Sequence, residues 1–285
     1  MPVSATLAAV LLALGSSLAF GFADFFGGTL SRRAALLTVV LLSQAAGLVV
    51  IGVVVLARAE PFPGAAILPW TTLASVFGTF GIAALYRGLA VGVMSVVAPI
   101  AATAAVIPVV VGAVRGEAPT SVQNAGIGVA LAGVLLASRA PVEPGIVRRF
   151  AEGAGLGITA AVFIGLFLAA FDRAAEPDPY WATLIGRGGS TLLIALAVLA
   201  ARPSLRLGRP ALALVAVVGL LDVVGNTLFA VASTKGLVGV VSVLSSLYPV
   251  VTVALARGIH GERLSRAQAF GVAGAFAGVG LIAAG

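Results

Sequence analysis

Long apolar runs recur along almost the whole of this 285-residue chain. An α-helix rises about 1.5 Å per residue, so roughly 20 apolar residues suffice to cross the ~30 Å hydrocarbon layer of a bilayer. We therefore predict an all-α integral membrane protein with ten transmembrane helices. The predicted spans are residues 4–29, 35–57, 65–86, 92–114, 120–138, 152–171, 180–201, 211–233, 238–257 and 267–284.

The composition agrees with a lipid environment and excludes several function classes. Hydrophobic residues make up 60% of the chain and charged residues 9%, which leaves too little polar surface to cover a soluble globule. Cysteine is absent, which excludes disulfides, thiol catalysis and thiolate metal sites. The sequence contains no phosphate-binding loop of the Gly-x-x-x-x-Gly-Lys-Ser/Thr type. We predict no cofactor, no metal site and no nucleic-acid partner.

The distribution of Lys and Arg predicts how the chain is oriented in the membrane, since basic joints stay in the cytoplasm. Joints after the odd-numbered spans hold twelve basic residues, and joints after the even-numbered spans hold four, namely Arg58, Arg115, Arg173 and Lys235. This count places both termini outside the cytoplasm. The first apolar run lacks a basic n-region and a clear cleavage site, so we expect it to be retained as a span of the cell membrane.

The chain contains an internal repeat. The segment GLAVGVMSVVAPI at 88–100 recurs as GLVGVVSVLSSL at 236–247, and each copy leads to a Gly-Glu pair, at 116–117 and 261–262. We predict two halves of five spans, residues 1–140 and 150–285, joined by a short linker at 141–149. Because five is odd, the second half is inverted relative to the first. Secondary transporters commonly use this plan and bind substrate between the halves near mid-membrane.

Several of these stretches resemble the EamA family of the drug/metabolite transporter (DMT) superfamily. They are FGFADFFGGTLSRR, ALYRGLAVGVMSVVAPI, the doubled Gly-Glu turn and VLSSLYPVVTVALARGIHGERLSRAQAFGVAGAFAGVGLIAAG. The resemblance covers nearly the whole chain in order. It implies ten helices in two EamA repeats and export of small metabolites such as amino acids, drugs or related amphiphiles. It also implies that both termini are inside the cell, against the Lys/Arg count; we follow the count because the split is large.

Polar side chains within the spans are the candidate site. A charge at this depth costs several kcal/mol unless it is paired or hydrated, so an intramembrane ionisable residue indicates function. Asp222 and Asn226 are four apart and share one helix face, and Arg187 and Gln44 occupy equivalent positions in the two halves. With Asp24, they are predicted to line a water-accessible cavity, where a guanidinium and a carboxylate hold the two ends of a zwitterion and Asp222 exchanges protons.

Structural explanations of the same residues remain open. An Arg187–Asp222 ion pair could lock two helices together, or Arg187 could extend to the interface. A single interhelical hydrogen bond would explain Asp24 or Gln44. Glycine pairs at small-xxx-small spacing indicate packing surfaces within one bundle or between two copies, so both a monomer and a homodimer are possible; they are Gly88, Gly92, Gly153, Gly157, Gly274 and Gly278.

Prolines within equivalent spans indicate hinges. Pro99 and Pro108 interrupt the span at 92–114, and Pro249 interrupts that at 238–257, each freeing a backbone carbonyl. They are candidate gating residues, although proline is also common in membrane helices. Tyr248 is a candidate for placing a phenol in the cavity, and Tyr86, at a predicted helix end, is expected to be an interfacial anchor.

The acidic residues of the Gly-Glu turns, Glu117 and Glu262, lie beside Arg115 and Arg263 and are expected to form turn-stabilising ion pairs or caps. The single histidine, His260, belongs to such a turn, and one histidine cannot form a metal site.

These observations favour a secondary active exporter of small molecules, driven by an ion or substrate gradient, with protons favoured over sodium. The alternatives are a passive channel and an intramembrane enzyme acting on lipid head groups. An enzyme would need convergent His, Cys or paired carboxylates near one interface, and the chain has one His and no Cys. We predict that the protein is not an enzyme.

Overall fold

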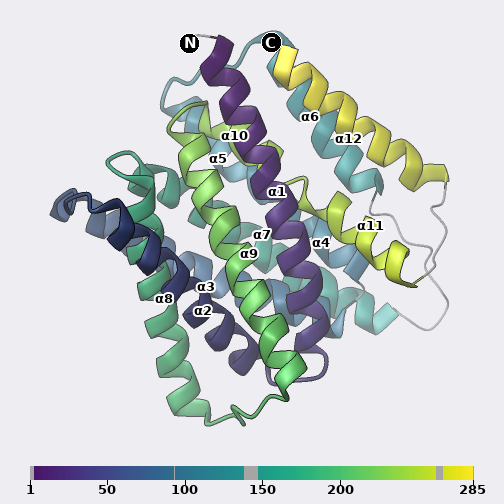
Figure 1. Cartoon of the computed structure of the whole chain (residues 1–285). Helices are drawn as coiled ribbons and strands as arrows, with labels where there is room; N and C mark the ends of the chain where they lie inside the picture. The colour runs from purple at the N-terminus through teal and green to yellow at the C-terminus, as the bar shows by residue number, and fades with distance from the viewer. Residues whose placement is uncertain (1–2, 93, 138–146, 261–265, 285) are drawn as a thin grey trace.

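The computed structural model describes residues 3–92, 94–137, 147–260 and 266–284, which fold into helices joined by short turns and contain no β-strand (Figure 1). The elements in chain order are α1 (Val3–Ser31), α2 (Leu36–Arg58), η1 (Ala65–Ile67), α3 (Leu68–Val91), α4 (Met94–Ala102), η2 (Thr103–Ala105), α5 (Val106–Val114), α6 (Ser121–Ala137), α7 (Val147–Ala175), α8 (Pro179–Ala201), α9 (Arg209–Ser233), α10 (Val238–Ser245), α11 (Tyr248–His260) and α12 (Arg266–Ala284). Residues 141–146 of the predicted linker and the pair at 261–262 lie outside the described residues, whereas 147–149 begin α7.

Six helices of the described part are long and apolar enough to cross a membrane. They are Thr6–Ser31, Leu36–Arg58, Ala65–Val91, Gly153–Ala175, Pro179–Ala201 and Arg209–Ser233. The other four predicted spans correspond to shorter apolar segments at Ile100–Val114, Ser121–Leu136, Val238–Thr252 and Ala269–Ile282. The prediction of an all-helical, multi-pass membrane protein is confirmed, and the total of ten crossings remains a prediction.

Two of the shorter segments are broken helices in equivalent parts of the chain. The predicted span at 92–114 consists of α4, the 3₁₀ turn η2 and α5, and that at 238–257 consists of α10 and α11. Pro108 lies in the first turn of α5, and Pro249 is the second residue of α11, where a missing N–H costs no hydrogen bond. Pro99 lies inside α4, which continues to Ala102. Helix breaks therefore precede two of the three predicted hinge prolines.

The main helix contacts recur when the two halves of the chain are exchanged. In such an exchange α1 corresponds to α7, α2 to α8, α3 to α9, α4–α5 to α10–α11 and α6 to α12. The α1–α9 contact is matched by α3–α7, and α2–α9 is matched by α3–α8. α2 packs on its own counterpart α8, as α6 does on α12. Two similar halves related by a pseudo-two-fold axis produce this pattern.

Counterpart helices run antiparallel. Between α2 and α8, Gln44 contacts Arg187, whereas Arg58 contacts Asp178 at 3.0 Å. Along this contact the residue numbers of α2 rise while those of α8 fall. Antiparallel counterparts are what an inverted second half produces.

The predicted glycine pairs pack helices of the same chain. Gly92 lies where α3 meets α7, and a Cβ on it would lie 2.8 Å from the Cα of Gly153. Gly278 lies where α12 meets α6, and its Cβ would lie 2.5 Å from the backbone N of Ala130. Because only a hydrogen fits at these contacts, the small residues allow close backbone approach without help from a hydrophobic effect.

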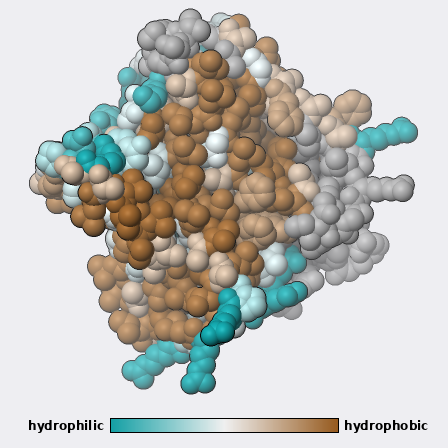
Figure 2. Space-filling view, viewed as in Figure 1, coloured by the Kyte–Doolittle hydropathy of each residue, from teal (hydrophilic) through white to brown (hydrophobic). Residues whose placement is uncertain are grey.

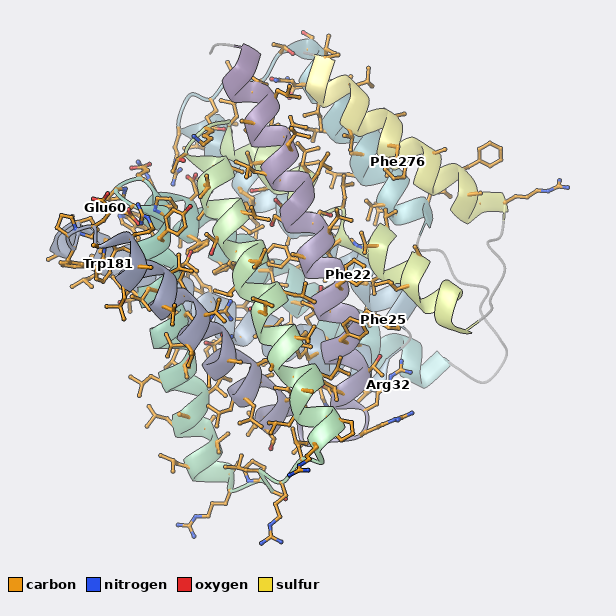
Figure 3. The ribbon with its side chains drawn as sticks, viewed as in Figure 1. Phe22, Phe25, Arg32, Glu60, Trp181 and Phe276 are labelled. Atoms are coloured by element: carbon orange, nitrogen blue, oxygen red, sulfur yellow. The ribbon has the colours of Figure 1, made fainter. Side chains whose placement is uncertain are left out.

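The outer surface is suited to lipid. Figure 2 shows one face covered by apolar side chains, with hydrophilic groups gathered at its margins. Leu11, Val49, Val53, Leu199 and Phe276 are 61–70% exposed, an exposure that a protein in water rarely tolerates over a whole flank. Phe276, labelled in Figure 3, belongs to α12, whose Phe270 is also exposed.

Polar side chains lie at the two ends of the bundle. The chain termini lie at one end (Figure 1). The Arg115–Asp172 ion pair at 2.6 Å lies beside Ser233, the last residue of α9. Arg32 lies beyond the other end of α1 (Figure 3), where its guanidinium donates to the backbone oxygen of Leu89. Glu117 accepts a hydrogen bond from the N–H of Val238, which caps α10. The expected capping role of Glu117 is thus found at a helix of the other half, and not in a pair with Arg115.

A single introduced cysteine can test which end faces the cytoplasm, because the natural chain has none. Ser204 and Thr234 are both exposed and lie in the joints after α8 and α9, at opposite ends of the bundle. If the Lys/Arg count is right, a membrane-impermeant maleimide labels Thr234→Cys in intact cells and labels Ser204→Cys only after permeabilisation. The reverse labelling would place both termini inside.

Candidate functional site

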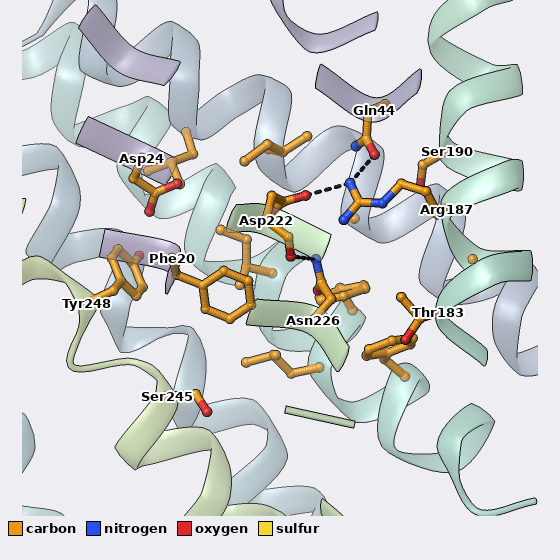
Figure 4. Close-up of a pocket in the computed structure, with 18 of the residues that line it drawn as sticks. Phe20, Asp24, Gln44, Thr183, Arg187, Ser190, Asp222, Asn226, Ser245 and Tyr248 are labelled. Carbon is orange, nitrogen blue, oxygen red and sulfur yellow. Dashed lines mark hydrogen bonds and ion pairs between the residues drawn. The ribbon is translucent and has the colours of Figure 1, made fainter. Parts of the chain in front are cut away.

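A cavity of about 110 Å³ lies between the two halves of the bundle (Figure 4). Side chains of α1, α2 and α3 from the first half and of α7, α8, α9 and the α10–α11 break from the second half line it. All six residues predicted to bind substrate or protons are among them: Asp24, Gln44, Arg187, Asp222, Asn226 and Tyr248.

Arg187 is the centre of a buried polar cluster. Its Nη1 lies 2.5 Å from Oδ2 of Asp222 and also donates a hydrogen bond to Oε1 of Gln44. The side chain of Arg187 is 5% exposed and that of Asp222 is 18% exposed. The amide of Asn226 donates to the backbone oxygen of Asp222 at 2.8 Å. Arg187 therefore does not extend to the interface; its ion pair joins α8 to α9 and also faces the cavity.

Two glycines bring these residues together. α2 and α9 touch at Gly47 and Gly219, where a Cβ on Gly47 would lie 2.8 Å from the backbone oxygen of Gly219. Gln44 lies three residues before Gly47, and Asp222 lies three residues after Gly219. Because residues three apart share a helix face, the close contact of the two backbones places both side chains within reach of Arg187.

Asp24 and Tyr248 form the opposite side of the cavity, together with Phe20 (Figure 4). Each of Asp24 and Tyr248 is 6% exposed. α11 can approach α1 here because Gly21 has no side chain: a Cβ on it would lie 2.9 Å from the backbone oxygen of Tyr248. The hydroxyl of Tyr248 has no hydrogen-bond partner within the described structure.

Tyr86 corrects one prediction. It is not an interfacial anchor, since it is 2% exposed and its hydroxyl donates to the backbone oxygen of Ala23 at 3.5 Å. The ring packs on α1 at Gly27. Gly27 has no side chain, and the phenol ring of Tyr86 occupies the space that this leaves. The position of Tyr86 beside Arg87 in the sequence did not indicate this contact.

The remaining wall is apolar. It consists mainly of Ile82 and Leu85 from α3 and of Phe167, Leu168 and Phe171 from α7. The rings of Phe167 and Phe171 are stacked with centroids 5.1 Å apart. A cavity with a charged side and an aromatic side suits an amphiphilic molecule.

Sequence reasoning missed several hydroxyls of the cavity. Thr183 and Ser190 line it from α8. Their spacing from Arg187, four residues before and three after, puts them on the same helix face and is the signal that could have revealed them. Ser245 and Ser246 line it where α10 ends. The three hinge prolines are not among the lining residues, although Pro249 directly follows Tyr248.

A multi-pass helical bundle in two similar halves, with charged side chains lining a cavity between them, is the architecture of many membrane transporters. The model of the EamA-like transporter family matches residues 7–139 and again residues 151–284, and the chain belongs to this family of DMT-type transporters. The match confirms the predicted family and its two repeats. A solved structure described only as "Crystal structure of protein" has a TM-score of 0.69 at 21% identity, over 98% of this chain and 96% of that chain, and so shares the fold. No match is found among curated proteins.

The contact that assembles the cluster can be tested with two matched substitutions. In Gly219→Ala the new methyl would meet the backbone oxygen of Ser43 and the backbone N of Gly47, which cannot move independently of α2. In Gly188→Ala the nearest atom is the flexible Cδ1 of Leu48, 4.0 Å away. We expect Gly219→Ala to lose about 1–3 kcal/mol of stability, seen as a lower melting temperature in detergent. Gly188→Ala melts like the parent, and equal melting of both variants would contradict the packing described.

Proposed function

We propose that this protein is a secondary active transporter that exports small amphiphilic metabolites, such as amino acids or drugs, by alternating access. The observation that carries the proposal is the Arg187–Asp222–Gln44 cluster, which is buried and yet faces a cavity between the halves. A dry ion pair that only joined helices would not need a cavity beside it. Charges at this depth are retained where they contact a substrate or an ion pathway.

The repeats supply the moving parts of the proposed mechanism. In this proposal residues 1–140 and 150–285 are two inverted five-span repeats, and the chain crosses the membrane ten times. The broken spans α4–α5 and α10–α11 are equivalent and lie beside each other at α5 and α10. A span that is divided into two half-helices can bend at the junction without losing many hydrogen bonds. Pro108 and Pro249 follow such junctions, and Pro99 lies inside α4; all three are proposed as hinge residues of the gates.

The alternative functions predict different experimental outcomes. A passive channel would equilibrate its solute and respond to no second gradient. An intramembrane enzyme would change its substrate chemically. We propose an ion gradient as the energy source, with protons as the coupling ion, because the cavity is lined by two buried carboxyl groups that can take up and release a proton.

The test begins with a thermal-shift screen of the purified protein against amino acids, nucleosides and cationic drugs, since a true ligand raises stability by mass action. The strongest hit is then followed in proteoliposomes with an imposed pH gradient. Asp222→Asn, which removes the partner of Arg187, is expected to abolish uptake. Removing one partner of a buried pair costs about 3–5 kcal/mol, so the neutral double variant Arg187→Gln with Asp222→Asn is included to preserve folding.

We expect the double variant to melt close to the parent and to transport less than a tenth as fast. Glu176→Gln, which alters an exposed carboxylate outside the cavity, serves as the control and keeps the parental rate. Full-rate transport by the folded double variant would refute a transport role for the cluster. Accumulation that ignores the pH gradient would indicate a channel.

A further inference from the structure

Three charged side chains line the central cavity, and their charges do not cancel. They are the cation Arg187 and the carboxylates Asp24 and Asp222. Arg187 is already paired with Asp222 at 2.5 Å. The carboxylate of Asp24 has neither an ion pair nor a hydrogen bond within the described ranges of the chain. The excess is therefore one negative charge, carried by Asp24.

The groups around Asp24 do not supply the missing positive charge. Tyr86 of α3 and Tyr248 of α11 face it, and both are neutral phenols. Asp222 of α9 is near enough to repel a negative charge on Asp24, while its own partner Arg187 of α8 lies on the far side of the cavity (Figure 4). An ionised carboxylate that is 6% exposed and faces a like charge is costly in this environment. A proton or a cationic ligand removes that cost.

The chemistry beside Asp24 fits an ammonium group. The hydroxyl of Tyr248 is buried without a partner and can accept a hydrogen bond from an N–H donor. Phe20 precedes Asp24 by one helical turn, and aromatic faces attract cations. A metal ion of the calcium or magnesium type needs about six oxygen ligands, whereas an ammonium group is satisfied by one carboxylate, one hydroxyl and a ring.

We propose that Asp24, Tyr248 and Phe20 form a subsite for a protonated amine, and that the substrates of this transporter are amphiphilic monocations. This inference rests on the proposed function of the cavity and narrows its substrate class. With Asp24 ionised, a monocation brings the charge of the occupied cavity to zero, whereas a zwitterion leaves one negative charge and an anion increases it.

Binding of the amine at this subsite is coupled to the release of a proton. Without substrate, the carboxyl of Asp24 holds a proton; the arriving R–NH₃⁺ displaces it, and the proton leaves to the solvent. One positive charge enters the site as one leaves, and no bond of the substrate changes. Proton coupling is thereby assigned to Asp24 in place of Asp222, because Arg187 keeps the latter carboxylate paired.

The ligand test compares three molecules that share a 3-methylbutyl group: isopentylamine as the cation, leucine as the zwitterion and 4-methylpentanoate as the anion. A cavity of this order holds an apolar group of about benzene's size, which the shared 3-methylbutyl group does not exceed. We expect isopentylamine alone to raise the melting temperature of the purified protein in detergent at low salt. Titration calorimetry in two buffers of different ionisation enthalpy is expected to show about one proton released per amine bound.

Two variants test the residues. Asp24→Asn is expected to weaken isopentylamine binding about tenfold or more and to abolish the proton release, and Tyr248→Phe to weaken binding roughly fivefold while the release persists. Asp24→Asn also reports on folding, because it replaces a buried carboxyl that is unpaired within the described residues by a neutral amide of similar size, and it should melt at or above the parental temperature. Glu176→Gln is the matched acid-to-amide control and binds the amine like the parent.

The proposal is overturned if leucine or 4-methylpentanoate shifts the melting temperature as much as isopentylamine does, if isopentylamine gives no shift, or if Asp24→Asn binds the amine with parental affinity. These results would leave the transporter function standing, since that depends on the loss of transport in the Arg187→Gln, Asp222→Asn double variant. Conversely, parental transport by the double variant would remove the proposed role of the cluster without affecting amine binding at Asp24.

Discussion

A guanidinium and a carboxylate buried in a membrane bundle must satisfy each other, and the rest of this structure is arranged around that requirement. Arg187 reaches Asp222 only because α2, α8 and α9 meet closely, and they meet closely because Gly47 and Gly219 bring two backbones into contact. The glycines are therefore as much a part of the site as the charged groups. A larger residue at either position would separate the helices and leave a costly unpaired charge in the interior.

The same principle explains why the cavity has two unlike sides. On one side every strong polar group is paired, through Arg187, Gln44 and Asp222. On the other side Asp24 and Tyr248 have unused hydrogen-bonding capacity. The two sides therefore differ in the hydrogen-bonding capacity that they leave open to the cavity, although their residues look alike as isolated polar positions in apolar sequence.

Much of the architecture could be predicted from the sequence because the bilayer imposes a length on its helices and a cost on buried charge. Those two constraints were enough to identify the long spans, and the repeat was enough to pair Gln44 with Arg187. The division of two spans into α4–α5 and α10–α11 was anticipated by Pro108 and Pro249, but not the lengths of the pieces. The burial of Tyr86 and the capping of α10 by Glu117 escaped prediction because each depends on a partner far away in the chain. Such contacts follow from how neighbouring helices pack, which no local pattern encodes.

The equivalence of Gln44 and Arg187 has a consequence for energetics. Exchanging the two halves restores the helix packing but replaces an amide by a guanidinium. If the halves trade conformations as the carrier opens alternately to each side, the two end states share a backbone geometry yet differ in electrostatic energy. Backbone symmetry then makes both states accessible, and side-chain asymmetry gives one of them the larger resting population. Under the proposed mechanism, the difference between Gln44 and Arg187 would be one source of that imbalance.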